Sequence, residues 1–198
     1  MTTVIKTTNL TKKYKNVYAL KDVSINIEKG EIYGIVGKNG AGKSTLLKLL
    51  SGITEPTKGS VELFQETNLM EQRKRMASIV ENPTLFGELS AKDNLEYFRI
   101  QRGVTDKNTI NETLRQVGLD PDDKKQVKKY SVGMKQRLAL ALSLLTNPEV
   151  LILDEPTNGI DPVGIVEIRH LLQALNEEKN VTIIISSHIL SSLANIAT

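Results

Sequence analysis

The sequence predicts an α/β fold in which a largely parallel sheet is covered by helices and interrupted by an all-helical segment. Apolar segments of strand length alternate with segments of helical periodicity in both the first and the last part of the chain. Between these parts, from about Leu89 to Leu145, only helical periodicity occurs. Because strands that alternate with helices favour a parallel sheet, we expect one layered core with an inserted helical lobe.

Four strands and one helix are predicted in the first part of the chain. The strands are 23–28, 31–36, 59–63 and 78–80, and the helix is 45–50. Residues 23–28 alternate apolar and polar side chains, which is typical of a half-exposed strand, whereas 31–36 are typical of a buried one. Gly52 is placed to end the helix.

The helical lobe shows one cap and one long apolar pattern. Asp93 is placed to cap a helix over residues 94–100. Apolar residues from Met134 to Leu145 keep helical spacing, and Pro148 ends that pattern. The lobe therefore contains at least two predicted helices.

The last part of the chain returns to alternating strands and helices. Residues 150–153 are all apolar, which favours a buried strand. Asp161 and Pro162 then have the types preferred at the N-cap and first position of a helix. A further strand is predicted at 181–185, and a last helix begins at Ile189-Leu190.

A glycine-rich loop joins the strand 31–36 to the helix after it. Eight residues fit G-x-x-x-x-G-K-[ST]: Gly37, Lys38, Asn39, Gly40, Ala41, Gly42, Lys43 and Ser44. Together with the next residue, Thr45, they form the set expected to bind phosphate. The glycines allow positive φ and close approach of a ligand, so the loop N–H groups form an anion site at the positive end of a helix dipole.

Two side chains of this loop have the chemistry to handle a nucleotide. Lys43 can reach the β- and γ-phosphates, and the Ser44 hydroxyl can bind Mg²⁺. A glycine-rich turn that matches by chance is the alternative interpretation. The strand before the loop and the helix after it argue against that alternative, because the motif requires this context. The sequence therefore predicts nucleotide binding.

Acidic and basic residues follow two of the other predicted buried strands. Asp154 and Glu155 come directly after 150–153, where an aspartate can hold Mg²⁺ and a glutamate can serve the attacking water. An acidic pair at a strand end is also a common structural feature. His188 follows the last strand, and strand ends in such sheets converge on the ligand crevice. His170, in the middle of a helix, is interpreted as structural.

Composition limits the other possible functions. The chain has 198 residues, 39% of them hydrophobic, no cysteine and a net charge of +3. This hydrophobic content suits one well-buried core, and the lack of cysteine excludes disulfides and thiolate metal sites. No apolar run approaches the roughly 20 residues that cross a bilayer. The basic clusters are interspersed with acidic residues and lack aromatics, so they indicate solvated faces rather than nucleic-acid binding.

At this point the sequence resembles the nucleotide-binding domain of ATP-binding cassette transporters over nearly its whole length. Gly37–Ser44 matches the Walker A motif, and 150–155 matches Walker B. Residues 158–161 match the D-loop, and His188 matches the switch histidine. Tyr14 matches the aromatic residue that stacks on adenine. Residues 130–137 match the signature motif, which distinguishes this family among phosphate-loop proteins.

Three features depart from the family pattern. The signature contains Ser-Val-Gly-Met at Ser131–Met134, where the family has Ser-Gly-Gly-Gln. Glu81 stands where the family usually has the Q-loop glutamine, a feature similar to the bacteriocin, lantibiotic and bacitracin self-protection exporters. The chain also stops at Thr198, whereas family members continue with further strands, so we expect a C-terminally short form.

The resemblance implies a P-loop NTPase core with a largely parallel sheet, antiparallel N-terminal strands and an inserted helical subdomain. It implies one nucleotide-binding domain over 1–198, with an ATPase core at 1–87 and 146–198 and a helical subdomain at 88–145. It also assigns ATP and Mg²⁺ as cofactors. The implied metal contacts are Ser44, Asp154 and Glu81, the catalytic residues Lys43, Glu155 and His188, and the contacts to a partner's nucleotide Ser131, Gly133 and Met134.

The same resemblance implies an assembly. Two nucleotide-binding domains, as a homodimer or a heterodimer, would enclose two ATP molecules and drive export through a separate transmembrane permease. The protein would then lie peripherally at the cytoplasmic face of the membrane. The exported compound, an antimicrobial peptide or antibiotic among the similar exporters, is selected by the permease.

Two other functions remain open from the sequence. A non-transport cassette ATPase acting on ribosomes or DNA would usually carry two cassettes or long coiled-coil insertions, and neither occurs here. An ATP-binding module without turnover is suggested by the short C-terminus. The intact Lys43, Asp154 and Glu155 argue against that second alternative.

Overall fold

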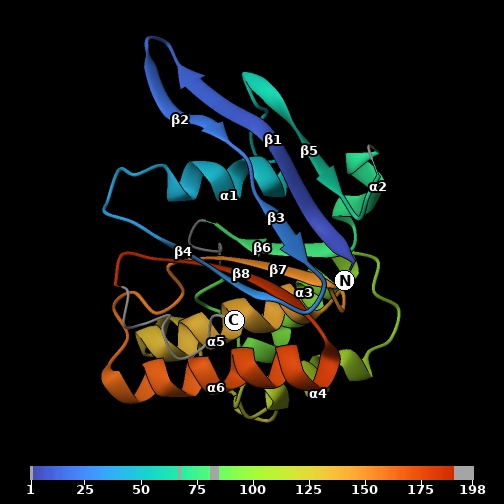
Figure 1. Ribbon diagram of the computed structural model, residues 1–198. Helices are drawn as coiled ribbons and strands as arrows, with labels where there is room; N and C mark the ends of the chain where they lie inside the picture. The colour runs from blue at the N-terminus through green and yellow to red at the C-terminus, as the bar shows by residue number, and fades with distance from the viewer. Residues whose placement is uncertain (1, 67, 81–84, 190–198) are drawn as a thin grey trace. The chain divides into compact units, whose positions relative to one another are not determined.

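The computed structural model describes residues 2–66, 68–80 and 85–189, and these form two compact units (Figure 1). The first unit comprises Met1–Val80, Glu149–Pro156 and Gln173–Thr198. The second unit comprises Glu81–Pro148 and Thr157–Leu172. Helix α6, Pro162–Lys179, contributes residues to both.

A four-stranded parallel sheet forms the base of the first unit. Its strands are β4 (Ile32–Val36), β6 (Met76–Ile79), β7 (Val150–Asp154) and β8 (Thr182–Ser187), in the order β4-β8-β7-β6. Every pair in it is parallel. The carboxyl ends of these strands meet along one edge, where Val36 pairs with Ser187 and Asp154 pairs with Ser186. The predicted parallel sheet is confirmed, and its edge positions the candidate site.

A second, antiparallel sheet confirms the antiparallel N-terminal strands that the resemblance implies. Its strands are β1 (Thr3–Tyr14), β2 (Val17–Val23), β3 (Asn26–Glu28) and β5 (Lys58–Leu63). The single strand predicted at 23–28 is wrong, because it is divided at Ser24 and Ile25. There the Thr7 hydroxyl accepts the Ile25 N–H and donates to the Val23 carbonyl, each at 3.0 Å. These two backbone groups therefore bond to a side chain, whereas in a continuous strand they would bond to the backbone of a neighbouring strand.

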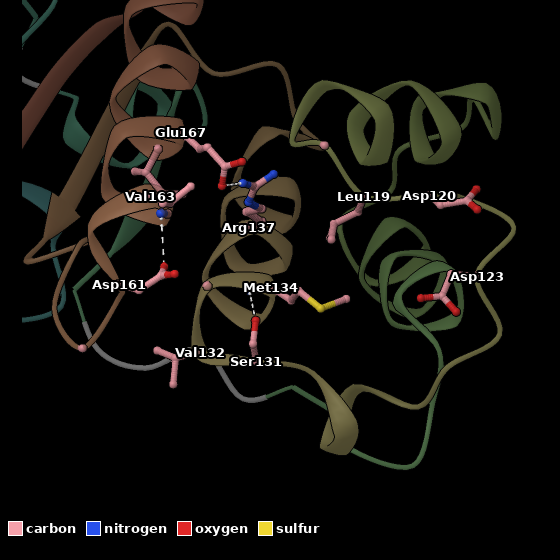
Figure 2. A pocket seen from close by; sticks show the side chains of 15 residues that line it. Leu119, Asp120, Asp123, Ser131, Val132, Met134, Arg137, Asp161, Val163 and Glu167 are labelled. Carbon is pink, nitrogen blue, oxygen red and sulfur yellow. Dashed lines mark hydrogen bonds and ion pairs between the residues drawn. The ribbon is translucent and has the colours of Figure 1, made fainter.

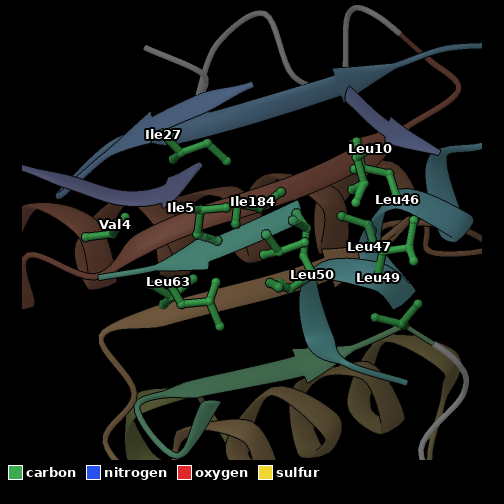
Figure 3. Packing of buried hydrophobic residues seen from close by; sticks show 14 residues of the cluster. Val4, Ile5, Leu10, Ile27, Leu46, Leu47, Leu49, Leu50, Leu63 and Ile184 are labelled. Atoms are coloured by element: carbon green, nitrogen blue, oxygen red, sulfur yellow. The ribbon is translucent and has the colours of Figure 1, made fainter. Parts of the chain in front are cut away.

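Helix α1, Lys43–Ser51, lies between the two sheets of the first unit (Figure 1). It ends as predicted at Gly52, which adopts a left-handed conformation. Its leucines are buried in a core that also takes in β1, β5, β7 and β8, as Figure 3 shows for Leu46, Leu47, Leu49 and Leu50. A fully buried leucine contributes roughly 1.5–3 kcal/mol, so this helix is anchored firmly where the phosphate loop ends. The short helix α2, Leu69–Arg73, completes the unit's described helices outside α6.

The second unit is helical, as predicted. It contains α3 (Ala91–Gln101), α4 (Asn108–Gln116), the 3₁₀ turn η1 (Val127–Lys129), α5 (Val132–Leu144) and the first part of α6. The predicted cap at Asp93 is wrong, because Ser90 caps α3. The Ser90 hydroxyl accepts the Asp93 N–H at 3.2 Å and donates to the Asp93 carboxylate at 2.6 Å.

Three further predictions concern the ends of elements and membrane spans. Asp161 accepts the Gly164 N–H at 3.1 Å in the first turn of α6, so the predicted N-cap is confirmed. The last predicted helix, from Ile189-Leu190, lies outside the described residues apart from its first residue. Within the described ranges, no helix combines the length and apolarity needed to cross a bilayer.

Candidate functional site

The phosphate loop connects β4 to α1 through two glycines in the left-handed region. Gly40 and Gly42 have φ of 83° and 91°. A Cβ on Gly42 would lie 2.4 Å from the Ala19 carbonyl oxygen, so only glycine fits there. Gly37, also predicted to have positive φ, is not among the residues that do. Its requirement is spatial instead, since a Cβ there would lie 3.1 Å from the Ala41 Cβ.

The Lys43 side chain is buried at the mouth of this loop. Its Nζ donates to the Gly37 carbonyl at 2.8 Å and to the Lys38 carbonyl at 3.4 Å. It also lies 3.2 Å from Glu155 Oε1, at the end of β7. A buried ammonium held by backbone carbonyls beside loop amides is well placed to bind a phosphate.

Glu155 links the loop to β8. Its Oε2 lies 2.5 Å from His188 Nδ1. Burial by itself raises the pKa of the Glu155 carboxyl, but hydrogen bonds from His188 and Lys43 outweigh burial and hold that pKa below its ordinary value. Glu155 is therefore ionised at neutral pH, which is the state required of a general base. The structure brings together all three residues predicted to be catalytic.

A cavity of about 350 Å³ opens over the loop. Eight residues line it: Ala19, Asn39, Gly40, Gly42, Lys43, Ser44, Thr45 and Glu155. Six of the predicted phosphate-binding positions, Ser44 among them, thus face one space together with the predicted base. Gly37 and Lys38 contribute the carbonyls that hold Lys43, and Ala41 packs against Gly37.

The donor set around the loop suits Mg²⁺. Among the described residues no cluster of three acidic, histidine or cysteine side chains could hold a metal by itself. Mg²⁺ does not require such a cluster, because it is usually held by one or two protein oxygens together with phosphate oxygens and water. The Ser44 hydroxyl and the Asp154 carboxylate supply hard oxygens of this kind. Glu81, the third predicted metal contact, lies outside the described residues.

A serine that the sequence did not single out connects the acidic pair. The Ser186 hydroxyl donates to Asp154 Oδ1 at 2.5 Å and accepts the Glu155 N–H at 2.9 Å. The pairing of Asp154 with Ser186 in the β7–β8 register explains this contact. No motif marks such a residue, and only the strand order reveals it.

Tyr14 occupies a different position from the one predicted. In the sequence Tyr14 precedes the first predicted strand, 23–28, and so is expected ahead of the sheet strands, but it is the last residue of β1. It pairs with Val17 on β2, and Ala19, two residues further along that strand, lines the phosphate-loop cavity. Residues two apart in a strand share a face, so Tyr14 and Val17 lie on the hairpin face that carries Ala19. Its half-exposed ring has Lys12 Nζ 5.0 Å from its centroid.

The signature residues lie in the second unit, around a separate cavity of about 680 Å³ (Figure 2). Ser131 is the N-cap of α5 and accepts the Met134 N–H at 3.2 Å. Ser131, Gly133 and Met134 all line this cavity, together with residues of the D-loop segment and α6. Within the cavity wall Arg137 is ion-paired with Glu167 and donates to the Val117 carbonyl, so α5 is tied to α6 and α4.

Comparison with known proteins identifies a family match. The profile of the family described as ABC transporter matches residues 20–158. The bacitracin transport ATP-binding protein BcrA of Bacillus licheniformis is 49% identical over 98% of this chain and 64% of its own length. The lantibiotic transport ATP-binding protein SrtF of Streptococcus pyogenes is 44% identical over 98% of this chain and 84% of its own. The chain thus spans less than two thirds of the BcrA relative.

Solved structures give the same fold. A dimeric structure of the ATP-binding cassette MJ0796, in a post-hydrolysis state bound to ADP and phosphate, superposes with a TM-score of 0.84. It is 29% identical in sequence, and the match covers 98% of this chain and 91% of that one. The cbiO1 protein from Clostridium perfringens, part of a transporter complex, matches with a TM-score of 0.87, at 30% identity, over 100% of this chain and 83% of that one.

Proposed function

Because the chain belongs to the ABC transporter family, we propose that it is the ATP-hydrolysing part of a transporter subunit that powers export through a separate membrane protein. The observation that carries this proposal is that Glu155, which lines the phosphate-loop cavity, contacts both Lys43 and His188. A phosphate-binding cation, an ionised carboxylate and a histidine at one strand edge are the groups that phosphoryl transfer to water requires.

The roles of the chain's own residues follow from their positions. The loop amides and Lys43 bind the phosphates and offset their charge. The ionised Glu155 orients the attacking water and accepts its proton. His188, bonded to Glu155, holds that carboxylate and senses the terminal phosphate. Ser44 and Asp154 would hold Mg²⁺, which supplies Lewis-acid stabilisation of the transferring phosphoryl group.

The exported compound is proposed from the relatives. The names of BcrA and SrtF assign them to bacitracin and lantibiotic transport. Both are 44% or more identical to this chain over 98% of it. We therefore expect the export of a peptide antibiotic of this kind, with the choice between peptides made by the membrane subunit. The protein would act at the cytoplasmic face of the membrane.

A paired arrangement is proposed for the active form. The MJ0796 cassette is dimeric in two of the matching structures. The cavity that contains Ser131 presents a helix N-terminus, where the backbone amides favour an anion. One phosphate loop already provides a cradle for its own ATP, so we assign the Ser131 cavity to the nucleotide of a second copy.

Transport into vesicles tests the proposed function. Inside-out vesicles containing the full-length protein and its membrane subunit should take up bacitracin or a lantibiotic when ATP is added. Lys43→Ala should abolish uptake, because the buried ammonium is lost from the phosphate loop. Lys58→Ala, which removes an exposed lysine on β5, is the matched control and should retain uptake. ATP-dependent uptake of neither peptide would reject the substrate class, and undiminished uptake by Lys43→Ala would reject the site.

A further inference from the structure

Ser186 is a buried hydroxyl in the parallel sheet that the proposed roles do not use. It lies on β8, between β4 and β7, and has no solvent exposure. Its position in the strand pairs with Asp154 on one side and with Ile35 on the other. The side chain therefore stands at the strand edge where the phosphate loop begins and the acidic pair follows β7.

The Ser186 hydroxyl both donates and accepts a hydrogen bond. A hydroxyl has one proton to donate and lone pairs to accept with. The proton goes to Asp154 Oδ1 at 2.5 Å, and the oxygen accepts the Glu155 N–H at 2.9 Å. The first bond is charge-assisted, since the acceptor is a carboxylate, and such bonds are shorter and stronger than neutral ones.

Glu155 needs this support because its backbone is strained. Its φ is 47°, in the left-handed region that residues other than glycine rarely adopt. Such conformations persist only where the surrounding structure imposes them, and they occur often at functional sites. The same turn places the Glu155 carboxylate against Lys43 Nζ and His188 Nδ1. A hydrogen bond to the Glu155 N–H therefore helps to fix the direction in which the Glu155 side chain, the candidate base, points.

We propose that Ser186 is a positioning residue for ATP hydrolysis, one hydroxyl that orients both the metal-binding carboxylate of Asp154 and the backbone of Glu155. Holding Oδ1 leaves the second carboxylate oxygen of Asp154 for the metal. Holding the N–H fixes the turn that aims Glu155 at the water. Ser186 is not among the residues that line the phosphate-loop cavity, so it would act through Asp154 and Glu155. This inference rests on the proposed function, because it deepens the account of the same site.

Two variants and one control separate positioning from simple loss of a buried hydrogen bond. Ser186→Ala removes both bonds, whereas Ser186→Thr keeps a hydroxyl on a residue type that suits a strand. Ser143→Ala is the control, because Ser143 is also buried and, among the described residues, its hydroxyl bonds a backbone carbonyl, that of Leu140 at 2.7 Å. A merely structural role predicts similar behaviour of the two alanine variants.

The test measures metal and nucleotide separately in the full-length protein. Mn²⁺ is titrated by electron paramagnetic resonance into the complex with a non-hydrolysable ATP analogue, and nucleotide affinity is measured without metal. Ser186→Ala should weaken Mn²⁺ binding and lower kcat by about 10-fold or more, as losses of this kind do at metal sites. Its metal-free nucleotide affinity should match wild type. Ser186→Thr should restore both properties, and Ser143→Ala should lose neither.

Several outcomes would overturn the inference. One is that Ser186→Ala keeps the Mn²⁺ affinity and the kcat of wild type. Another is that Ser186→Ala loses metal-free nucleotide affinity by the same factor as Mn²⁺ affinity. Amide hydrogen exchange in the wild-type protein decides the case if Ser186→Ala does not fold. Slow exchange of the Glu155 N–H supports the bond to Ser186, and exchange at the unprotected rate rejects it. If wild type itself does not hydrolyse ATP, the proposed function fails, while Mn²⁺ affinity and amide exchange still decide the role of Ser186.

Discussion

Lys43 and Glu155 lie far apart in the sequence and 3.2 Å apart in the structure. Their residue types and strand contexts were enough to predict that both serve one phosphate site. The same reasoning could not identify Ser186. A serine within an apolar strand carries no motif, and its importance depends on which strand pairs with β7. The sequence also placed Gly37 correctly in the loop but assigned it the wrong reason, since its φ is not positive and close packing against Ala41 is what favours glycine there.

Tyr14 yields a prediction at the same scale. If its ring stacks on the nucleotide base, Tyr14→Ala should weaken ATP binding by about 1–3 kcal/mol, which is roughly 5- to 150-fold in affinity. Turnover at saturating ATP should remain near wild type, because stacking contributes no chemistry. Equilibrium binding and steady-state kinetics measure the two effects.

The neighbouring Tyr18 provides the control for this measurement. It pairs with Lys13, so it lies on the opposite face of the hairpin from Tyr14 and Val17. Its ring is similarly exposed and similarly flanked by lysine. Tyr18→Ala should therefore leave ATP affinity unchanged. Unchanged affinity with a collapse of kcat in Tyr14→Ala would instead show that Tyr14 takes part in the chemistry.

Among the elements, those with a strong local pattern were predicted and β1 was not. β4, β7, β8 and α1 have apolar runs or clear helix ends, and all four were predicted to within a few residues. β1 is rich in threonine and lysine, and it becomes a strand because β2, β3 and β5 all pair with it. That stabilisation is non-local, so no sequence window contains it.

An acid-sensitive ion pair joins the residues that directly precede β6 and β7. Arg75 donates to both carboxylate oxygens of Glu149, at 2.7 and 3.0 Å, next to the first residues of these strands. The hydrogen bond from Arg75 lowers the pKa of Glu149 below its ordinary value of 4.5. Both side chains are partly exposed, at 41% and 39%, so we expect a contribution of less than about 1 kcal/mol.

The sign of the pH dependence follows from the lowered pKa. The unfolded state binds the proton more tightly, so the Glu149 carboxylate stabilises the fold above pH 4.5, and this stability is lost as pH falls through the folded-state pKa. Urea unfolding should show Glu149→Gln less stable than wild type at pH 7, with the difference shrinking as pH falls below 4.5 and vanishing below the folded-state pKa. Glu71→Gln, which removes a more exposed pair with Lys74, should show a smaller difference. A Glu149→Gln difference that persists unchanged at pH 3 would contradict this account.

At the scale of the whole molecule, the fold class followed from the order of strands and helices, but the strand order did not. Insertion of β8 between β4 and β7 is what brings His188 and Ser186 to the acidic pair. Sequence order alone allows other arrangements of the same strands. The structure also divides the chain into units in which residues 157–172 accompany the helical lobe, whereas the sequence placed them with the core.

The proposed pairing of two copies can be tested by mixing inactive variants. In a two-fold dimer, Lys43→Ala damages one copy's phosphate loop and Ser131→Arg damages the site contributed to the partner. Mixed dimers then carry both lesions in one composite site and keep the other intact. Random mixing makes half of the dimers mixed, so about a quarter of wild-type ATPase activity should return.

Crosslinking completes this test. An inactive mixture would be expected if both residues served the same copy, or if the two sites were obligatorily coupled. Cysteines introduced by Asn39→Cys and Ser131→Cys distinguish these cases, because these 198 residues contain no other cysteine. A disulfide between chains with ATP bound supports the pairing. Its absence under the same conditions contradicts it.

The most direct measurement is the fate of ATP bound to Glu155→Gln in the full-length protein with its membrane subunit. We expect the variant to bind ATP and to hydrolyse it at least roughly 100-fold more slowly than wild type, because the proton acceptor is gone. Acid quenching should then recover the bound nucleotide as ATP, whereas Glu149→Gln, at the opposite end of β7, should release ADP at the wild-type rate. ATP turnover by Glu155→Gln near the wild-type rate would show that this carboxylate does not drive hydrolysis.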